Sequence, residues 1–203
     1  MNIKEILIIL GEPNSTFSEL LLKYFKSDNF KRNKKKIILV GSKKLFEKQC
    51  KVLNYRIKLN DISNIKQSKS KLINIINVNY KFKKPFSKIS NISNKYITQC
   101  FNLSLKIIRE NHNIALINGP ISKEHFLKKK YPGVTEYIAE KTSSKSPVML
   151  IYNSNLSVTP LTTHTPLKNV SKSIKKEKIK ISILKIDNFF KKYLKKKPNI
   201  AVL

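Results

Sequence analysis

The amino-acid sequence predicts an α/β fold, layered α/β/α, around a mostly parallel sheet. Short apolar runs alternate with amphipathic stretches along the 203 residues, which is the pattern of strands alternating with helices. The apolar runs are rich in β-branched residues and are apolar at nearly every position. Strands of this kind are covered on both faces, as they are in parallel sheets.

Six apolar runs are predicted as strands, at residues 6–10, 37–40, 73–78, 114–118, 148–152 and 156–160. A further strand-like run, residues 199–203, comes after Pro198, which ends the helix before it. Natural termini are usually frayed, so an apolar run at this position suggests that more of the sheet should follow. A short terminal edge strand is the alternative.

Four stretches between these runs are predicted as helices, at residues 18–26, 43–53, 95–110 and 175–196. The last is the clearest, because apolar residues recur along it at helical spacing, at Ile179, Ile183, Ile186, Phe190 and Leu194. These side chains share one helical face, and such a face is expected to pack in a core. The Ser- and Lys-rich stretch 60–71 is predicted as a surface loop.

The formal net charge is +30, from 42 Lys and Arg residues against 12 Asp and Glu residues. This charge suits a nucleic-acid or acidic-membrane partner, so a basic nucleic-acid-binding protein on an α/β scaffold is the alternative function. However, only three of the 42 basic residues are Arg, and the lysine runs at 34–36, 128–130 and 195–197 are scattered. Because nucleic-acid surfaces more often gather Arg and aromatic residues on one face, we favour a solvated lysine surface and expect no nucleic-acid partner.

The two cysteines, Cys50 and Cys100, stand in apolar, helix-like stretches, and the sequence has no CxxC motif or Cys/His cluster. A disulfide framework or structural zinc site is therefore not expected, and a reducing cytosol is the default compartment. The opening apolar run is too short to span a membrane and lacks a signal-peptide cleavage pattern. We expect a cytoplasmic protein with no membrane partner.

Two glycine-containing segments follow predicted strands and are candidate ligand sites, because ligands gather at the carboxyl ends of strands in α/β proteins. The first is Gly-Glu-Pro-Asn-Ser-Thr at residues 11–16, where a Ser or Thr is available to cap the next helix. The second is Asn-Gly-Pro-Ile-Ser-Lys at residues 118–123, where Lys123 is suited to a phosphate or carboxylate. A structural turn is the alternative for each segment.

Two further candidates lie later in the chain. Thr135 stands at a predicted helix start, where its hydroxyl and the exposed N–H groups suit an anion such as phosphate; an N-cap is the alternative. His164 follows a predicted strand, where an imidazole is able to bind a divalent metal or transfer a proton; a structural histidine is the alternative. His112 and His125 are assigned no role, and no catalytic triad or carboxylate pair is visible.

Taken in order, these segments resemble 4-hydroxythreonine-4-phosphate dehydrogenases of pyridoxal-phosphate biosynthesis. GEPNSTFSEL resembles the family's GDPAGIGPE opening, INGPISKEHF its TxPINK segment, and YPGVTEYIAEKT its GHTEFLA segment. The most specific part is VMLIYNSNLSVTPLTTHTPLKNV, which is similar to the family's segment containing TtHiPLkdV. The closing PNIAVL resembles the stretch that precedes GLNPHAGE in the family.

The resemblance implies an enzyme that oxidises the secondary alcohol of 4-hydroxythreonine 4-phosphate, a small phosphorylated hydroxy amino acid, with NAD. Loss of CO2 then gives 3-amino-2-oxopropyl phosphate. The resemblance also implies a fold like that of isocitrate and isopropylmalate dehydrogenases, a homodimer, and a divalent metal (zinc, magnesium or cobalt) held by three His. Such a metal stabilises negative charge on the reacting oxygen.

By position in the resemblance, His164 matches the first metal-binding His, and Thr135 matches a substrate-contacting Thr. Lys123 matches the Lys of the PINK segment and is expected near the substrate. Val134 stands where the family has a substrate-contacting His. Because a valine side chain cannot donate a hydrogen bond, we expect weaker phosphate or carboxylate binding, or an altered substrate.

The 203 residues match the N-terminal portion of the dehydrogenase fold, and the second half is expected to be absent. In the family the other two metal-binding His and most of the NAD site lie beyond the position of Leu203, so no residue is assigned to NAD or to catalysis. A catalytic metal site typically has three protein ligands. We therefore expect no independent catalysis by this chain, whether it is a fragment, part of a split gene or a degenerate non-catalytic relative.

Overall fold

The computed structural model describes residues 3–111, 113–128 and 130–203. His112 and Lys129 lie outside these ranges, and Lys129 belongs to one of the predicted lysine runs. The chain forms two compact units, Asn2–Lys128 and Lys129–Leu203. In the described ranges, no helix combines the length and the apolar character that crossing a membrane requires.

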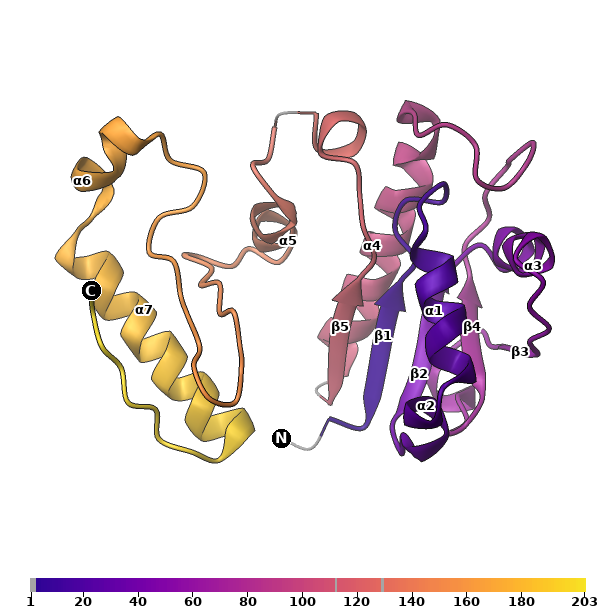
Figure 1. Ribbon diagram of the computed structural model, residues 1–203, viewed down its shortest axis with the longest axis horizontal. Coiled ribbons are helices and arrows are strands. Elements are labelled where there is room, and N and C mark those ends of the chain that lie inside the picture. The colour runs from indigo at the N-terminus through magenta and orange to yellow at the C-terminus, as the bar shows by residue number, and fades with distance from the viewer. Residues whose placement is uncertain (1–2, 112, 129) are drawn as a thin grey trace. The chain divides into compact units, whose positions relative to one another are not determined.

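The first unit is built on a five-stranded sheet in the order β3-β4-β2-β1-β5 (Figure 1). Every pairing between neighbouring strands is parallel. The strands are β1 (Glu5–Ile9), β2 (Lys36–Gly41), β3 (Leu59–Asp61), β4 (Ile73–Asn77) and β5 (Ile114–Asn118). The parallel sheet that the apolar runs predict is therefore confirmed for the first four predicted strands.

Helices cover both faces of this sheet (Figure 1). α1 (Phe17–Lys26) and α3 (Lys43–Val52) place Leu22 and Phe46 in the same buried cluster as Ile8 of β1. α4 (Asn94–Glu110) packs on the opposite face and buries Phe101. These three helices match predicted helices to within a residue or so at each end, and the α/β/α layering is confirmed.

Shorter elements complete the first unit. None of them was predicted, because each is too short to show a helical period. They are α2 (Asp28–Arg32), the 3₁₀ turns η1 (Ile65–Gln67) and η2 (Asn91–Ser93), and the π-helical turn η3 (Lys123–Leu127).

The edge strand β3 corrects one prediction, because residues 60–71 were expected to form a loop throughout. Asn74, fully buried in β4, explains the difference. Its amide oxygen accepts hydrogen bonds from Asn60 Nδ2 (2.8 Å) and from the backbone N–H of Lys69 (2.9 Å). Its amide nitrogen donates to the carbonyl of Ile37 at 2.8 Å. One buried side chain therefore ties the polar stretch to two strands, and this connection leaves no periodic signal in the sequence.

The second unit is mainly helical and irregular. It contains α5 (Val134–Lys141), η4 (Leu167–Asn169), α6 (Val170–Ser173), α7 (Lys176–Phe189) and the π-helical turn η5 (Phe190–Leu194). The predicted strands at 148–152 and 156–160 are wrong, since these segments meet only in an isolated antiparallel bridge between Ile151 and Val158. The predicted strand at 199–203 is also wrong, since it is irregular and exposed. A strand needs a ladder of hydrogen bonds to a neighbour, and in the described part of the chain these runs make no more than that single bridge.

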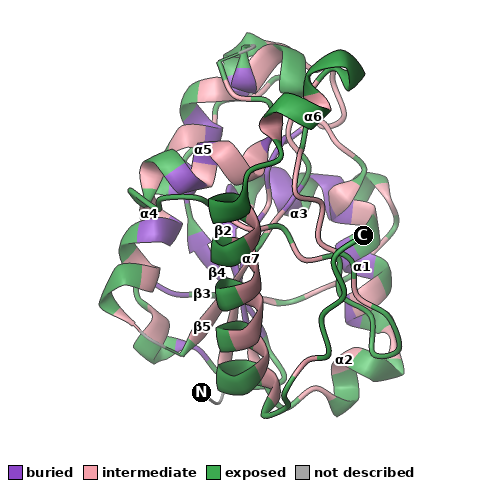
Figure 2. Cartoon of the chain, turned by 90° about the vertical axis from the view of Figure 1, so that its left-hand side faces the viewer, coloured by how far each residue is buried: buried purple, intermediate pink, exposed green. Residues whose placement is uncertain are grey.

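The helix α7 follows the predicted stripe, but the stripe is not a closed core. Figure 2 shows α7 in pink and green, with no purple residue along it. All five stripe residues are of intermediate exposure. Tyr152 and Phe190 approach with ring centroids 6.2 Å apart, and Lys185 Nζ donates to the carbonyl of Lys145 at 2.7 Å. The stripe therefore faces the rest of its unit without being fully covered by it.

Candidate functional site

The loops after β1 and β5 pack against each other at the carboxyl edge of the sheet. The N–H of Gly119 donates to the carbonyl of Ile9 (2.7 Å), and the N–H of Glu12 donates to the carbonyl of Pro120 (2.8 Å). Gly11 has φ +72°, and a Cβ there would lie 2.4 Å from the Pro120 oxygen. A Cβ at Gly119 would lie 2.6 Å from the Leu10 oxygen, so close packing of the two loops explains both glycines.

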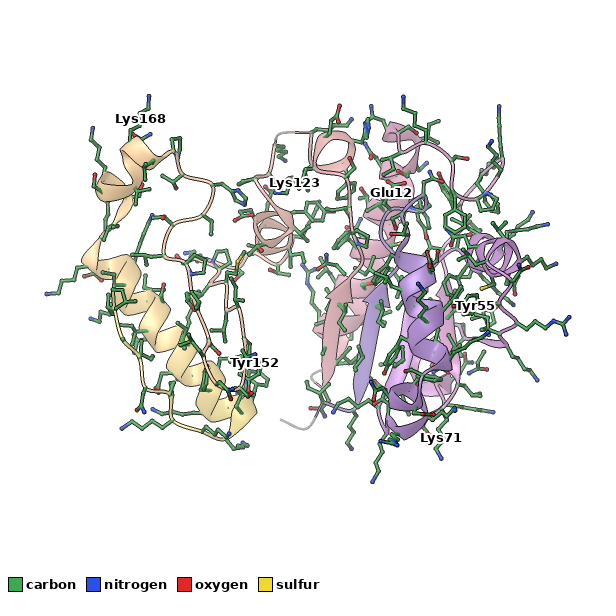
Figure 3. The ribbon with its side chains drawn as sticks, viewed as in Figure 1. Glu12, Tyr55, Lys71, Lys123, Tyr152 and Lys168 are labelled. Carbon is green, nitrogen blue, oxygen red and sulfur yellow. The ribbon has the colours of Figure 1, made fainter. Side chains whose placement is uncertain are left out.

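Glu12 is 3% exposed and lies beyond the carboxyl end of β1 (Figure 3). Ser93 Oγ donates a hydrogen bond to one carboxylate oxygen at 2.8 Å, and the N–H of Asn14 donates to the other at 3.2 Å. Both oxygens are therefore partnered by elements of the first unit. Glu12 lies within the predicted candidate segment 11–16, although no role was predicted for this acid.

Lys123 is exposed and opens η3, just after β5 (Figure 3). Ser122 caps this turn, since its hydroxyl accepts a hydrogen bond from the N–H of His125 at 3.1 Å. Ser122 is therefore the N-cap of η3. Lys123 itself belongs to the first unit, whereas the remaining predicted site residues belong to the second.

The two cysteines do not contribute a reactive thiol. Cys50 and Cys100 are both buried and free. Burial raises the pKa of the Cys50 thiol to about 11 and that of Cys100 to about 12. Both side chains are protonated at neutral pH, and a protonated thiol is neither a nucleophile nor a metal ligand.

The start of α5 brings the predicted substrate residues together. Gly133 is the N-cap, Val134 the first helical residue and Thr135 the second. Thr135 is therefore not the N-cap itself, which was the structural alternative for this residue. Both Val134 and Thr135 are of intermediate exposure. The first backbone N–H groups of a helix lack intrahelical partners and favour an anion, so this end suits a phosphate.

His164 lies beside this helix start. A Cβ built on Gly133 would be 3.6 Å from His164 Nε2, so the imidazole reaches the N-cap of the helix that carries Thr135. His164 is exposed and has φ +57°, in the left-handed region. It does not end a strand as expected, because the segment before it is irregular. Non-glycine residues at positive φ are uncommon, and such backbones cluster at functional sites.

Glu136 also lies at the start of α5, beside Gly133 and His164, and no role was predicted for it from the sequence. Its Oε2 lies 3.0 Å from the same Cβ position on Gly133. That oxygen is buried and has no hydrogen-bond partner among the described residues. A signal for it was present, because an acid three residues after an N-cap commonly folds back towards the helix start.

The family profile described as "Pyridoxal phosphate biosynthetic protein PdxA" matches residues 33–203. The match covers both described units and includes the segments that carry Thr135 and His164.

The chain belongs to the PdxA family.

One PdxA relative is the 4-hydroxythreonine-4-phosphate dehydrogenase of Sulfurihydrogenibium sp. (strain YO3AOP1), which is 32% identical over 202 residues. The match covers 98% of this chain and 62% of that protein. Another is the D-threonate 4-phosphate dehydrogenase of Salmonella typhimurium (strain LT2), 23% identical over 215 residues, covering 100% of this chain and 63% of that protein. The chain therefore spans less than two thirds of the length of these curated relatives.

The PdxA fold is supported by a solved structure as well. A 4-hydroxythreonine-4-phosphate dehydrogenase from Burkholderia phymatum superposes with a TM-score of 0.81 at 19% identity. The superposition covers 94% of this chain and 59% of that protein. The fold expected from the sequence resemblance is thereby confirmed.

The resemblance to PdxA proteins implies a divalent metal. The residues at the α5 start provide part of what such a metal needs. His164 offers an imidazole nitrogen and Glu136 a buried oxygen without a partner, and both atom types are ligands of zinc and related metals. In the described part of the chain, no group of three His, Cys, Asp or Glu side chains stands ready to hold a metal. These residues therefore supply a portion of a ligand set.

Proposed function

We propose that this chain is the N-terminal part of a 4-hydroxythreonine-4-phosphate dehydrogenase, which oxidises its substrate's secondary alcohol with NAD and releases CO2 to give 3-amino-2-oxopropyl phosphate. Family membership supports a dehydrogenase of pyridoxal phosphate biosynthesis. The observation that carries the proposal is the approach of the His164 imidazole to the helix start that bears Thr135.

Each residue has a distinct part in this proposal. The Thr135 hydroxyl and the first N–H groups of α5 bind the phosphorylated substrate. His164 helps to hold a divalent cation, which would supply Lewis-acid stabilisation of negative charge on the substrate oxygen. Binding the substrate and the cation at one place offsets part of the entropic cost of bringing them together for reaction.

Two properties of the complete enzyme are part of the proposal. We place the reaction in the cytoplasm, with the two free cysteines as support, and we expect a homodimer as the family resemblance implies. The 203 residues alone should not turn over, because His164 and Glu136 fall short of the three protein ligands of a typical catalytic metal site.

The test is an NADH absorbance assay on the product of the complete gene, with 4-hydroxythreonine 4-phosphate and added zinc, magnesium or cobalt. Replacing His164 by Ala should lower metal-dependent turnover by at least about 100-fold, since loss of even an outer-shell partner typically costs 10–100-fold. The circular-dichroism spectrum should hardly change, because the side chain is exposed. The matched control is His125→Ala, which lies in η3. Full activity in His164→Ala would remove this residue from the metal site.

Val134 bears on the choice of substrate. The PdxA relatives act, by name, on 4-hydroxythreonine 4-phosphate or on D-threonate 4-phosphate, so both compounds belong in the assay. Val134→His should tighten substrate binding by about fivefold, the value of one added hydrogen bond of roughly 1 kcal/mol. Titration calorimetry on the same protein measures it. An unchanged affinity for both compounds would show that this position does not face the ligand.

A further inference from the structure

The Glu136 carboxylate sits in an unusual environment for an acid. Its Oε2 is shielded from solvent and accepts no hydrogen bond from any described residue. Shielding a carboxylate oxygen without a partner is unfavourable, because the water that it loses is not replaced. Glu140, one turn further along α5, shows the contrast, since its carboxylate is exposed and lies 3.5 Å from Lys130 Nζ.

Helix capping does not account for this oxygen. An acid at the third helical position often accepts a hydrogen bond from the N–H of the N-cap residue, which here is Gly133. No such bond is made by Oε2. The oxygen lies near the N-cap residue without accepting a hydrogen bond from it.

The space beside Gly133 is where Glu136 and His164 converge. A Cβ at this glycine would lie 3.0 Å from Glu136 Oε2 and 3.6 Å from His164 Nε2. Gly133 has φ −158°, an extended conformation that any residue adopts, so the backbone does not require a glycine. Because glycine has no side chain, there is room beside it for both Glu136 Oε2 and His164 Nε2.

We propose that Glu136 is a further ligand of the divalent cation, binding through Oε2 beside His164 Nε2. This inference rests on the proposed function, because it concerns the same cation. A carboxylate oxygen and an imidazole nitrogen are compatible ligands for zinc, cobalt and manganese. The cation would give the shielded oxygen the partner that it lacks, and it would offset the negative charge of the Glu136 carboxylate.

Manganese(II) is the probe for this site, because it broadens the NMR signals of nearby nuclei and therefore reports weak binding and its location. In the ¹⁵N-labelled 203-residue chain, the amide signals of Gly133, Thr135 and Thr163 should broaden first. Glu136→Gln and His164→Ala should each raise, by at least tenfold, the manganese concentration that produces the same broadening. The control is Glu177→Gln, an exposed acid in the first turn of α7, and it should behave as the wild type.

A second variant guards against a folding defect in Glu136→Gln. Gly133→Ala keeps both ligands but puts a methyl group 3.0 Å from Oε2, so it should also weaken the broadening while the amide spectrum stays dispersed. If both Glu136→Gln and Gly133→Ala match the wild type while His164→Ala does not, Glu136 is no ligand and the proposed function stands. Unchanged broadening in all variants, or none near Gly133 at millimolar manganese, would overturn this inference and the metal role of His164 together.

Discussion

At the scale of single residues, the two glycines of the β1 and β5 loops decide how the carboxyl edge of the sheet closes. Gly11 has the only positive φ among the described glycines, and its Cα approaches the backbone of Gly119 and Pro120. Glycine has no Cβ and populates positive φ freely. The first candidate segment is therefore shaped by packing, whereas His164 carries a left-handed backbone without being a glycine.

Gly11→Ala should destabilise the chain by about 3 kcal/mol, from the strain of a left-handed alanine and from its clash with a backbone oxygen. The clash is with the Pro120 carbonyl, 2.4 Å from the new Cβ. Urea unfolding measures the effect. The control is Asn54→Gly, where φ is +57° and glycine should be neutral or mildly stabilising. Equal stability of Gly11→Ala and the wild type would mean that the two loops separate easily.

At the scale of secondary-structure elements, the strands and helices of the first unit follow local sequence patterns. The exception is β3, which is short and polar and depends on contacts with Asn74 of β4. Asn74 makes hydrogen bonds to three separate stretches of backbone or side chain while it is fully buried. It is therefore the residue that joins the edge of the sheet to its centre.

Asn74→Leu should lower the free energy of unfolding by on the order of 3 kcal/mol, because several buried donors and acceptors lose their partner at once. The control is Asn79→Ala, an exposed amide bonded to Asn77 at 2.9 Å, which should cost less than about 0.5 kcal/mol. Chemical denaturation followed by circular dichroism distinguishes them. A Leu variant as stable as the wild type would show that the polar network contributes nothing net.

At the scale of the whole molecule, charge is the dominant feature. The net charge of +30 comes mostly from lysines, and acidic partners are few. Several of those acids are occupied in exposed ion pairs, such as Lys23–Glu19 and Lys31–Asp28. Exposed pairs contribute little stability, so the surface is best described as solvated lysine with long-range positive potential.

Any contact of this lysine surface with nucleic acid should depend on salt concentration and not on base sequence. Any affinity for a generic duplex should fall by about a thousandfold or more between roughly 50 and 200 mM salt, as counterion release requires. Fluorescence anisotropy with two unrelated duplexes at each salt concentration measures it. Tight binding that survives the higher salt and discriminates between the duplexes would instead support a nucleic-acid-binding function.

Much of the first unit was predictable because its signals are local. The runs at β1, β2, β4 and β5 are apolar on both faces, and the periods of α1, α3 and α4 are plain in the sequence. The same reasoning failed at 148–160, where Ile151, Leu156 and Val158 are 60%, 75% and 53% exposed. An apolar run becomes a strand only when a neighbouring strand supplies hydrogen bonds. The residues of the run do not show whether such a neighbouring strand is present.

The parallel α/β core, the resemblance to a family, and the candidate residues Thr135, Val134 and His164 could all be found from sequence, because periodicity and motifs are properties of neighbouring residues. The position of His164 beside Gly133, and of a buried Glu136 oxygen at the same place, became visible in the folded chain. Those side chains come from an irregular segment and a helix start that are distant in sequence. Their approach depends on packing and on a left-handed backbone at His164, neither of which local sequence encodes.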